Sequence, residues 1–130
     1  MEIKKEYPPN IEEIKKHFNL RSDVIFTYGD TLYTPSGGYI NKPLMLHEET
    51  HSRQQAEMGV DKWWKKYIED VDFRLEQELE AYKNQINAFN KNNKKNRVKC
   101  VMFLNDIARD LSGGLYGNII SFEEAIIKLK

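Results

Sequence analysis

Residues 44–55 read LMLHEETHSRQQ, and the interpretation of the whole chain starts from this stretch. It contains His47, Glu48 and His51 at the spacing H-E-x-x-H. On a helix, residues four apart lie on one face, about 40° apart around the axis and one turn apart along it. The imidazoles of His47 and His51 can therefore bind one metal ion. Glu48 projects about 100° from His47, where it would contact a water molecule held by that ion.

The other positions of this predicted helix favour a metal site over ordinary core packing. Leu44, Gln54, Gln55 and Met58 project on the same side as the two histidines, whereas Glu49, Arg53 and Glu57 project outward. An ordinary amphipathic helix would present a stripe of Leu, Ile or Val to the core. Buried polar groups need partners, and a metal ion supplies them. The alternative is a chance match to a short motif.

Composition limits the class of protein. The chain has 130 residues, which fits one domain, and 20 Lys and Arg residues balance 20 Asp and Glu residues. A net charge of zero provides no global field that attracts nucleic acid. We see no signal peptide and no apolar run of transmembrane length, and the single Cys100 fits a reducing compartment. We therefore expect a cytoplasmic protein that binds neither nucleic acid nor membrane.

The hydrophobic pattern predicts an α+β fold, a mostly helical single domain spanning residues 1–130. A small antiparallel sheet precedes the H-E-x-x-H helix, with a hairpin over 24–28 and 31–34 and a third short strand at 39–40. We expect six helices. Four of them span residues 10–18, 71–89, 101–111 and 121–129. The H-E-x-x-H helix begins at 41–43 and ends near Gly59, and the helix after it is capped by Asp61 and extends through Ile68. An edge of the sheet could hold an extended peptide, or the strands could simply cover the helix.

Two further features have simple explanations. The pair Trp63 and Trp64 indicates packing or an interface more than a ligand stack. His17, the third histidine, projects from the exposed side of a short helix, so we do not expect it to bind metal.

The third metal ligand is predicted to be a carboxylate. Catalytic zinc usually has three protein ligands, and no further histidine or cysteine is well placed. Among Glu76, Glu78 and Glu80 of the long helix, only Glu78 falls near the apolar stripe, roughly 60° from its centre. A carboxylate there is costly unless it is paired. We expect Glu78 to bind zinc; the alternative is an ion pair with Arg53 or Arg74.

These residues also carry a family resemblance. The pair HEETH and ELEAY resembles the gluzincin metallopeptidases, which combine H-E-x-x-H with a glutamate on a later helix. The form E-x-x-A resembles the prenyl-protein endopeptidase branch, in which the first glutamate is the ligand; that position is Glu78 here. Four residues later that branch commonly has Asp, which supports a ligand histidine, and this chain has Tyr82. The run from Leu44 to Gln85 resembles small proteins of phages and prophages that are classed as metallopeptidases, which implies a minimal zincin-like fold and the host-cell cytoplasm.

The predicted function is a zinc metallopeptidase that cleaves a peptide or protein substrate. Glu48 is expected to act as general base toward a zinc-activated water. A second group should stabilise the oxyanion, and Tyr116 is the first choice over Tyr82 and Tyr39. Further side chains should orient the ligand histidines, and Gln54, Gln55 and Arg74 are the candidates.

Two other functions remain open. The chain could be a non-catalytic, zinc-containing interaction module, a degenerate peptidase used in phage assembly or host interference. Such a site would be closed by four protein ligands and would not need Glu48. A nucleic-acid binder using Lys91 to Lys99 would bind in a salt-dependent way, and the zero net charge argues against it.

Overall fold

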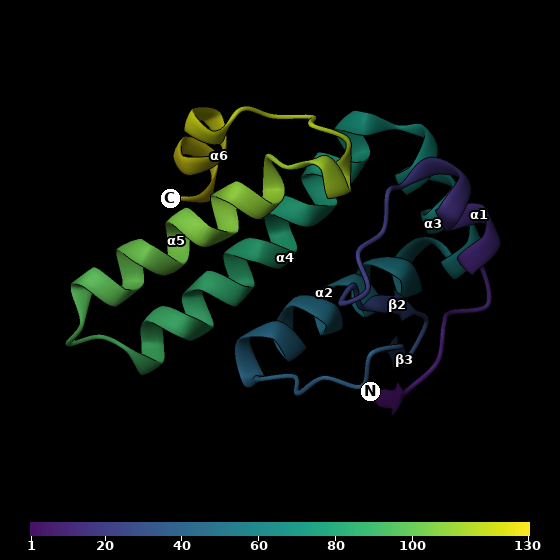
Figure 1. Cartoon of the computed structure of the whole chain (residues 1–130), viewed down its shortest axis with the longest axis horizontal. Helices are drawn as coiled ribbons and strands as arrows, with labels where there is room; N and C mark the ends of the chain where they lie inside the picture. Colours follow the sequence, from purple (N-terminus) through teal and green to yellow (C-terminus); the bar gives the residue numbers. More distant parts are fainter.

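A computed structural model describes all 130 residues as a mostly helical single domain with a small three-stranded sheet near its start (Figure 1). This confirms the predicted fold class. The elements in chain order are β1 (Glu2–Lys4), α1 (Ile11–His17), β2 (Phe26–Tyr28), β3 (Thr31–Tyr33), α2 (Lys42–Met58), α3 (Val60–Glu69), α4 (Val71–Asn92), α5 (Arg97–Leu111), the 3-10 turn η1 (Gly114–Tyr116) and α6 (Phe122–Leu129).

The sheet is mixed and not purely antiparallel as predicted. Strands β2 and β3 form the expected antiparallel hairpin, with Thr27 opposite Leu32. The third strand is β1, which pairs in parallel with β3 and gives the order β1-β3-β2. The predicted strand at Tyr39–Ile40 is wrong: these residues have no regular structure, and Tyr39 is 87% exposed. Because β1 already pairs with the remaining edge of β3, a strand at 39–40 has no partner there.

Local sequence explains the ends of α2. The Asn41 side chain accepts a hydrogen bond from the backbone N–H of Leu44, and Pro43 occupies the first turn. The helix ends at Gly59, whose φ of 97° favours glycine. Both ends match the prediction. The predicted cap of the next helix is wrong, because α3 is preceded by Gly59 and not by Asp61. The Asp61 side chain instead accepts a hydrogen bond from the Tyr28 hydroxyl.

Helix α2 lies between two apolar clusters and packs against α4, α3 and β2. The larger cluster joins α4, α5, η1 and α6, and the smaller one joins α1, β2 and β3. No apolar residue of α2 is buried; its buried residues are His47, Glu48, Thr50, His51, Gln54 and Gln55. The fully buried side chains of this helix are therefore all polar, and such groups need specific partners.

The tryptophan pair, the third histidine and the α4–α5 turn can each be compared with their predictions. Trp63 is buried, 1% exposed, and packs against its neighbours, which agrees with a packing role. His17 is exposed and contacts only Glu13 of its own helix. Helix α4 runs three residues further than predicted and α5 begins earlier, so residues 91–99 form the turn between these two helices and its flanks. No helix is both long and apolar enough to cross a membrane.

Candidate metal centre

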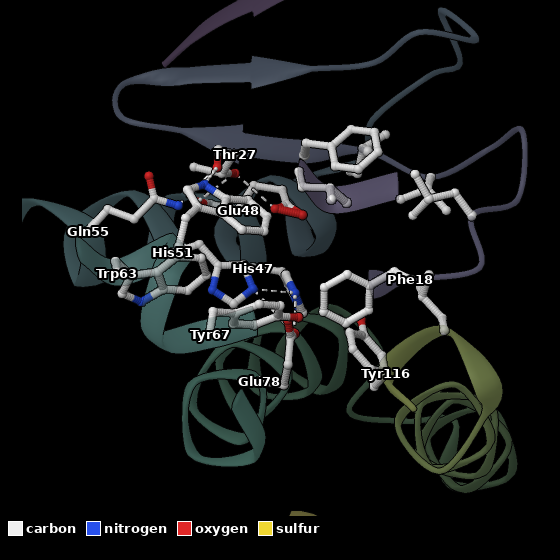
Figure 2. Close-up of a pocket in the computed structure, with 17 residues that line it drawn as sticks. Phe18, Thr27, His47, Glu48, His51, Gln55, Trp63, Tyr67, Glu78 and Tyr116 are labelled. Atoms are coloured by element: carbon white, nitrogen blue, oxygen red, sulfur yellow. Dashed lines mark hydrogen bonds and ion pairs between the residues drawn. The ribbon is translucent and has the colours of Figure 1, made fainter. Parts of the chain in front are cut away.

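Three side chains of types that can bind a metal ion meet between α2 and α4. His47 and His51 come from α2 and Glu78 from α4, and each residue is at most 5% exposed. The two Nε2 atoms are 3.1 Å apart, and Glu78 Oε1 is 3.2 Å from each of them (Figure 2). This group could hold a metal ion. Donors bound tetrahedrally at the usual zinc distances lie about 3.3 Å apart, so the observed triangle is close to the size that zinc needs.

Gln54 determines which tautomer the neutral His51 ring adopts. The Gln54 amide nitrogen donates to the Gln77 carbonyl and to a Glu80 oxygen, so its Oε1 is the atom that faces His51. That oxygen lies 2.8 Å from His51 Nδ1, which must therefore donate. In the neutral imidazole, Nε2 then has no proton and points its lone pair at the triangle, as a ligand does. The expected role of Gln54 thus has a structural basis.

His47 is oriented by packing. Its ring contacts the ring of Tyr82 at a centroid distance of 4.4 Å and an angle of 68°. Its Nδ1 is buried without a hydrogen-bond partner, whereas a ligand histidine ordinarily has an acceptor there. Tyr82 therefore does not act as the Asp at this position does in the resembling family, because its hydroxyl bonds to Tyr116 instead.

Gln55 and Arg74 do not orient the histidines, so these two predictions were wrong. Gln55 joins α2 to the hairpin, donating to the Thr27 carbonyl and accepting from the Gly29 N–H. Trp64 also donates to the Thr27 carbonyl. Since both lone pairs of this β2 carbonyl are occupied, it cannot accept a hydrogen bond from an extended peptide, and the hairpin covers the helix at this point.

The alternative ion pairs for Glu78 do not form. Arg53 pairs with Glu57 and Glu80 on the exposed surface. Arg74 is buried, and it donates to three backbone carbonyls, those of residues 67, 68 and 116. Glu78 instead contacts the two histidines through Oε1 and accepts a hydrogen bond from the Tyr67 hydroxyl at Oε2, at 2.5 Å.

The electrostatics of the group favour a positive charge among these side chains. Burial lowers the pKa of His51, but the nearby Glu78 carboxylate outweighs it and raises that pKa to about 9. Burial would raise the pKa of Glu78, yet the charge and hydrogen bonds of the two imidazoles hold it well below its usual range. A metal cation would satisfy the same carboxylate in place of a proton.

Glu48 lies beside the group and is held by the hairpin. It is buried, and the hydroxyl of Thr27 on β2 donates to its Oε2 at 3.0 Å. Figure 2 shows Glu48 between Thr27 and His47. The charge of Glu48 is one of the causes that raise the pKa of His51, as expected of a close neighbour. Glu48 is thus a second buried carboxylate at the site, outside the three-residue group.

Two cavities meet at this point. One of about 80 Å³ is lined mostly by apolar side chains of α1, β2 and α3 and by the three-residue group. The other, of about 330 Å³, lies between the segment 34–40, the loop 21–25, the middle of α4 and the C-terminal end of α5. His47, Glu48 and Tyr116 line both cavities. The larger cavity therefore reaches the edge of the three-residue group at His47 and the neighbouring Glu48.

The three candidate tyrosines are placed differently. Tyr116 is buried in η1, where a loop was predicted, and its hydroxyl is 2.6 Å from that of Tyr82. Burial raises the pKa of both hydroxyls well above the usual range, so both keep their protons. One of the two hydrogens joins the pair and the other is free to donate elsewhere. Tyr39 is exposed, although it lines the larger cavity.

Sequence reasoning missed two residues that contact the site. Tyr67 falls in the helix predicted after Asp61, and Thr27 falls in the first strand of the predicted hairpin. Their chain positions gave no sign of contact with Glu78 and Glu48, because both contacts join elements that only the tertiary structure brings together. A polar Thr27 between two aromatic residues of a strand was the one available signal, since alternate residues face opposite sides.

Comparison of the sequence and structure with protein-family models, curated proteins and solved structures found no match. The function must therefore be argued from the site itself.

Proposed function

We propose that this protein is a zinc-dependent metallopeptidase in which His47, His51 and Glu78 hold the metal and Glu48 is the general base. The observation that carries the proposal is the convergence of three buried donor atoms, 3.1–3.2 Å apart, beside a separate buried carboxylate. Burying two imidazoles and two carboxylates together costs free energy, and a bound cation offsets that cost.

The donor set favours a catalytic over a structural zinc site. Two imidazoles and one carboxylate are a ligand set of zinc peptidases, whereas structural sites are closed by four protein ligands. The group here contains three residues, and Glu48 is not among them. A zinc ion bound at such a site polarises a carbonyl group and acidifies water.

The protein's own side chains then carry the proton transfers. Thr27 holds the Glu48 carboxylate in place through its hydroxyl. Glu48 accepts a proton from the attacking water and passes it to the nitrogen of the leaving amine. In the arrangement in which Tyr82 donates to Tyr116, the Tyr116 hydrogen is free and donates to the carbonyl oxygen as that oxygen gains negative charge.

The cavities suggest how a peptide would lie. The larger cavity has room for main chain and side chains next to Glu48, and its walls carry Arg21, Asp23 and Asp110. The smaller cavity is mostly apolar away from the three-residue group, and its volume is below the roughly 150 Å³ that admits benzene. We therefore expect the scissile bond to be flanked by a small aliphatic residue whose side chain enters the smaller cavity.

The test combines metal analysis with a peptide library read by mass spectrometry. The wild type should carry about one zinc and cleave a subset of peptides. Glu48→Gln should keep the zinc and lose at least 100-fold in rate, since general-base catalysis contributes about that much or more. Glu49→Gln is the matched control, because the adjacent Glu49 is exposed on the opposite side of α2 and should cleave like the wild type.

The main alternative is the non-catalytic, zinc-containing module. It predicts stoichiometric zinc with no cleavage of any library peptide, and a Glu48→Gln protein indistinguishable from the wild type. A protein that takes up no metal after incubation with zinc would exclude both the peptidase and this module.

A further inference from the structure

The two oxygens of the Glu78 carboxylate have different partners. Oε1 faces Nε2 of both histidines at 3.2 Å, and Oε2 accepts the Tyr67 hydroxyl hydrogen at 2.5 Å. A carboxylate can bind a metal through one oxygen or through both. We propose that Tyr67 is a positioning residue that occupies Oε2 and so restricts Glu78 to one metal-binding oxygen, Oε1. This inference rests on the metal site of the proposed function.

Helix α3 holds the Tyr67 ring firmly. Trp63 stacks on it with centroids 4.8 Å apart and planes at 21°, and the Trp63 indole N–H donates to Gln77, the neighbour of Glu78 on α4. From α4, Arg74 donates to the backbone carbonyls of Tyr67 and Ile68 at the end of α3. Figure 2 shows the Tyr67 ring lying directly beside Glu78. The hydroxyl therefore has little freedom to move away from Oε2.

The Tyr67–Glu78 contact is a charge-assisted hydrogen bond in which the phenol donates. A phenol carries one hydrogen at neutral pH and a carboxylate can only accept, so Tyr67 is the donor of this bond. An O–H bonded to a carboxylate at 2.5 Å belongs to the short, strong class. The single hydrogen of Tyr67 is thus committed to Oε2.

The consequence concerns the number of open metal positions. With Glu78 bound through one oxygen, the protein supplies three donor atoms. With both oxygens bound it supplies four, and one position fewer is left for water or a substrate carbonyl. Tyr67 therefore keeps a coordination position available without touching the substrate.

The experiment compares Tyr67→Phe with Tyr28→Phe. Both changes remove a tyrosine hydroxyl that donates to a carboxylate at 2.5 Å and keep the ring, but the partner of Tyr28 is Asp61, outside the site. Zinc affinity is measured by competition with a chelator, and metal geometry by the visible spectrum of the cobalt(II)-loaded protein. Four-coordinate cobalt absorbs more strongly in the visible range than five-coordinate cobalt.

In Tyr67→Phe we expect the cobalt bands to weaken, as Oε2 turns to the metal, and zinc affinity to fall by about 10- to 100-fold. Tyr28→Phe should match the wild type in both measurements. A cobalt spectrum unchanged in Tyr67→Phe would overturn the inference whatever the affinity, and would leave the proposed function intact. A wild type that takes up neither metal would overturn the metal site and this inference together.

Discussion

Metal removal is the most direct perturbation, because the three-residue group joins two helices. His51 and Glu78 are 27 positions apart in the chain, so no preformed site exists in the unfolded protein. Zinc should therefore bind the folded form almost exclusively and stabilise it. The matched substitutions are His51→Ala, which removes a ligand, and His17→Ala, which removes the exposed histidine that contacts only Glu13.

The rise in Tm on zinc binding depends on the binding free energy and on the entropy of unfolding. At a free zinc concentration 1,000 times the dissociation constant, binding adds about 4 kcal/mol to the free energy of unfolding. The unfolding entropy of a 130-residue chain is about 0.27 kcal/mol per kelvin, from an average of about 2.1 cal/mol per kelvin for each residue. Dividing the first by the second gives a rise in Tm of about 15 °C.

Differential scanning fluorimetry with and without chelator measures this shift. The wild type and His17→Ala should both gain about 15 °C on zinc addition, and His51→Ala should gain almost nothing. A wild type whose Tm does not respond to zinc would refute the metal-site argument. An equal rise in His51→Ala would show that zinc binds elsewhere.

Three further predictions follow from individual contacts. First, the pKa of His51 is raised to about 9 in the folded protein. The stability that the protonated His51 adds is fully present only below its unfolded-state pKa of about 6.5, so the metal-free protein should lose stability as pH rises from about 6.5 through 9. Midpoints of urea unfolding that stay constant over this pH range would contradict this prediction. Thr27→Val removes the donor to Glu48 and should slow peptide cleavage by about tenfold or more with zinc content unchanged; steady-state kinetics and metal analysis decide, and a wild-type rate would count against positioning by Thr27. Arg74→Met leaves three buried carbonyls without their donor and should cost about 3 kcal/mol in urea unfolding; a loss below about 1 kcal/mol would contradict that role.

Much of the local structure could be predicted because it depends on neighbouring residues. Asn41, Pro43 and Gly59 determine where α2 begins and ends, and Ser121 with Glu124 does so for the start of α6. The polar inward face of α2 was visible as a helical projection. The wrong prediction of a strand at Tyr39–Ile40 shows the limit of local patterns. These residues favour strands, but β1 occupies the edge of β3 that they would need.

The sequence by itself determined the H-E-x-x-H helix, the side of it that carries His47 and His51, and the choice of Glu78 over Glu76 and Glu80, because helical periodicity is a local property. Only the tertiary structure decided that Glu78 reaches both histidines, that Tyr67 occupies its other oxygen and that Thr27 holds Glu48. These contacts join elements far apart in the chain. Their distances depend on how α2, α3, α4 and the hairpin pack together, which no local pattern encodes.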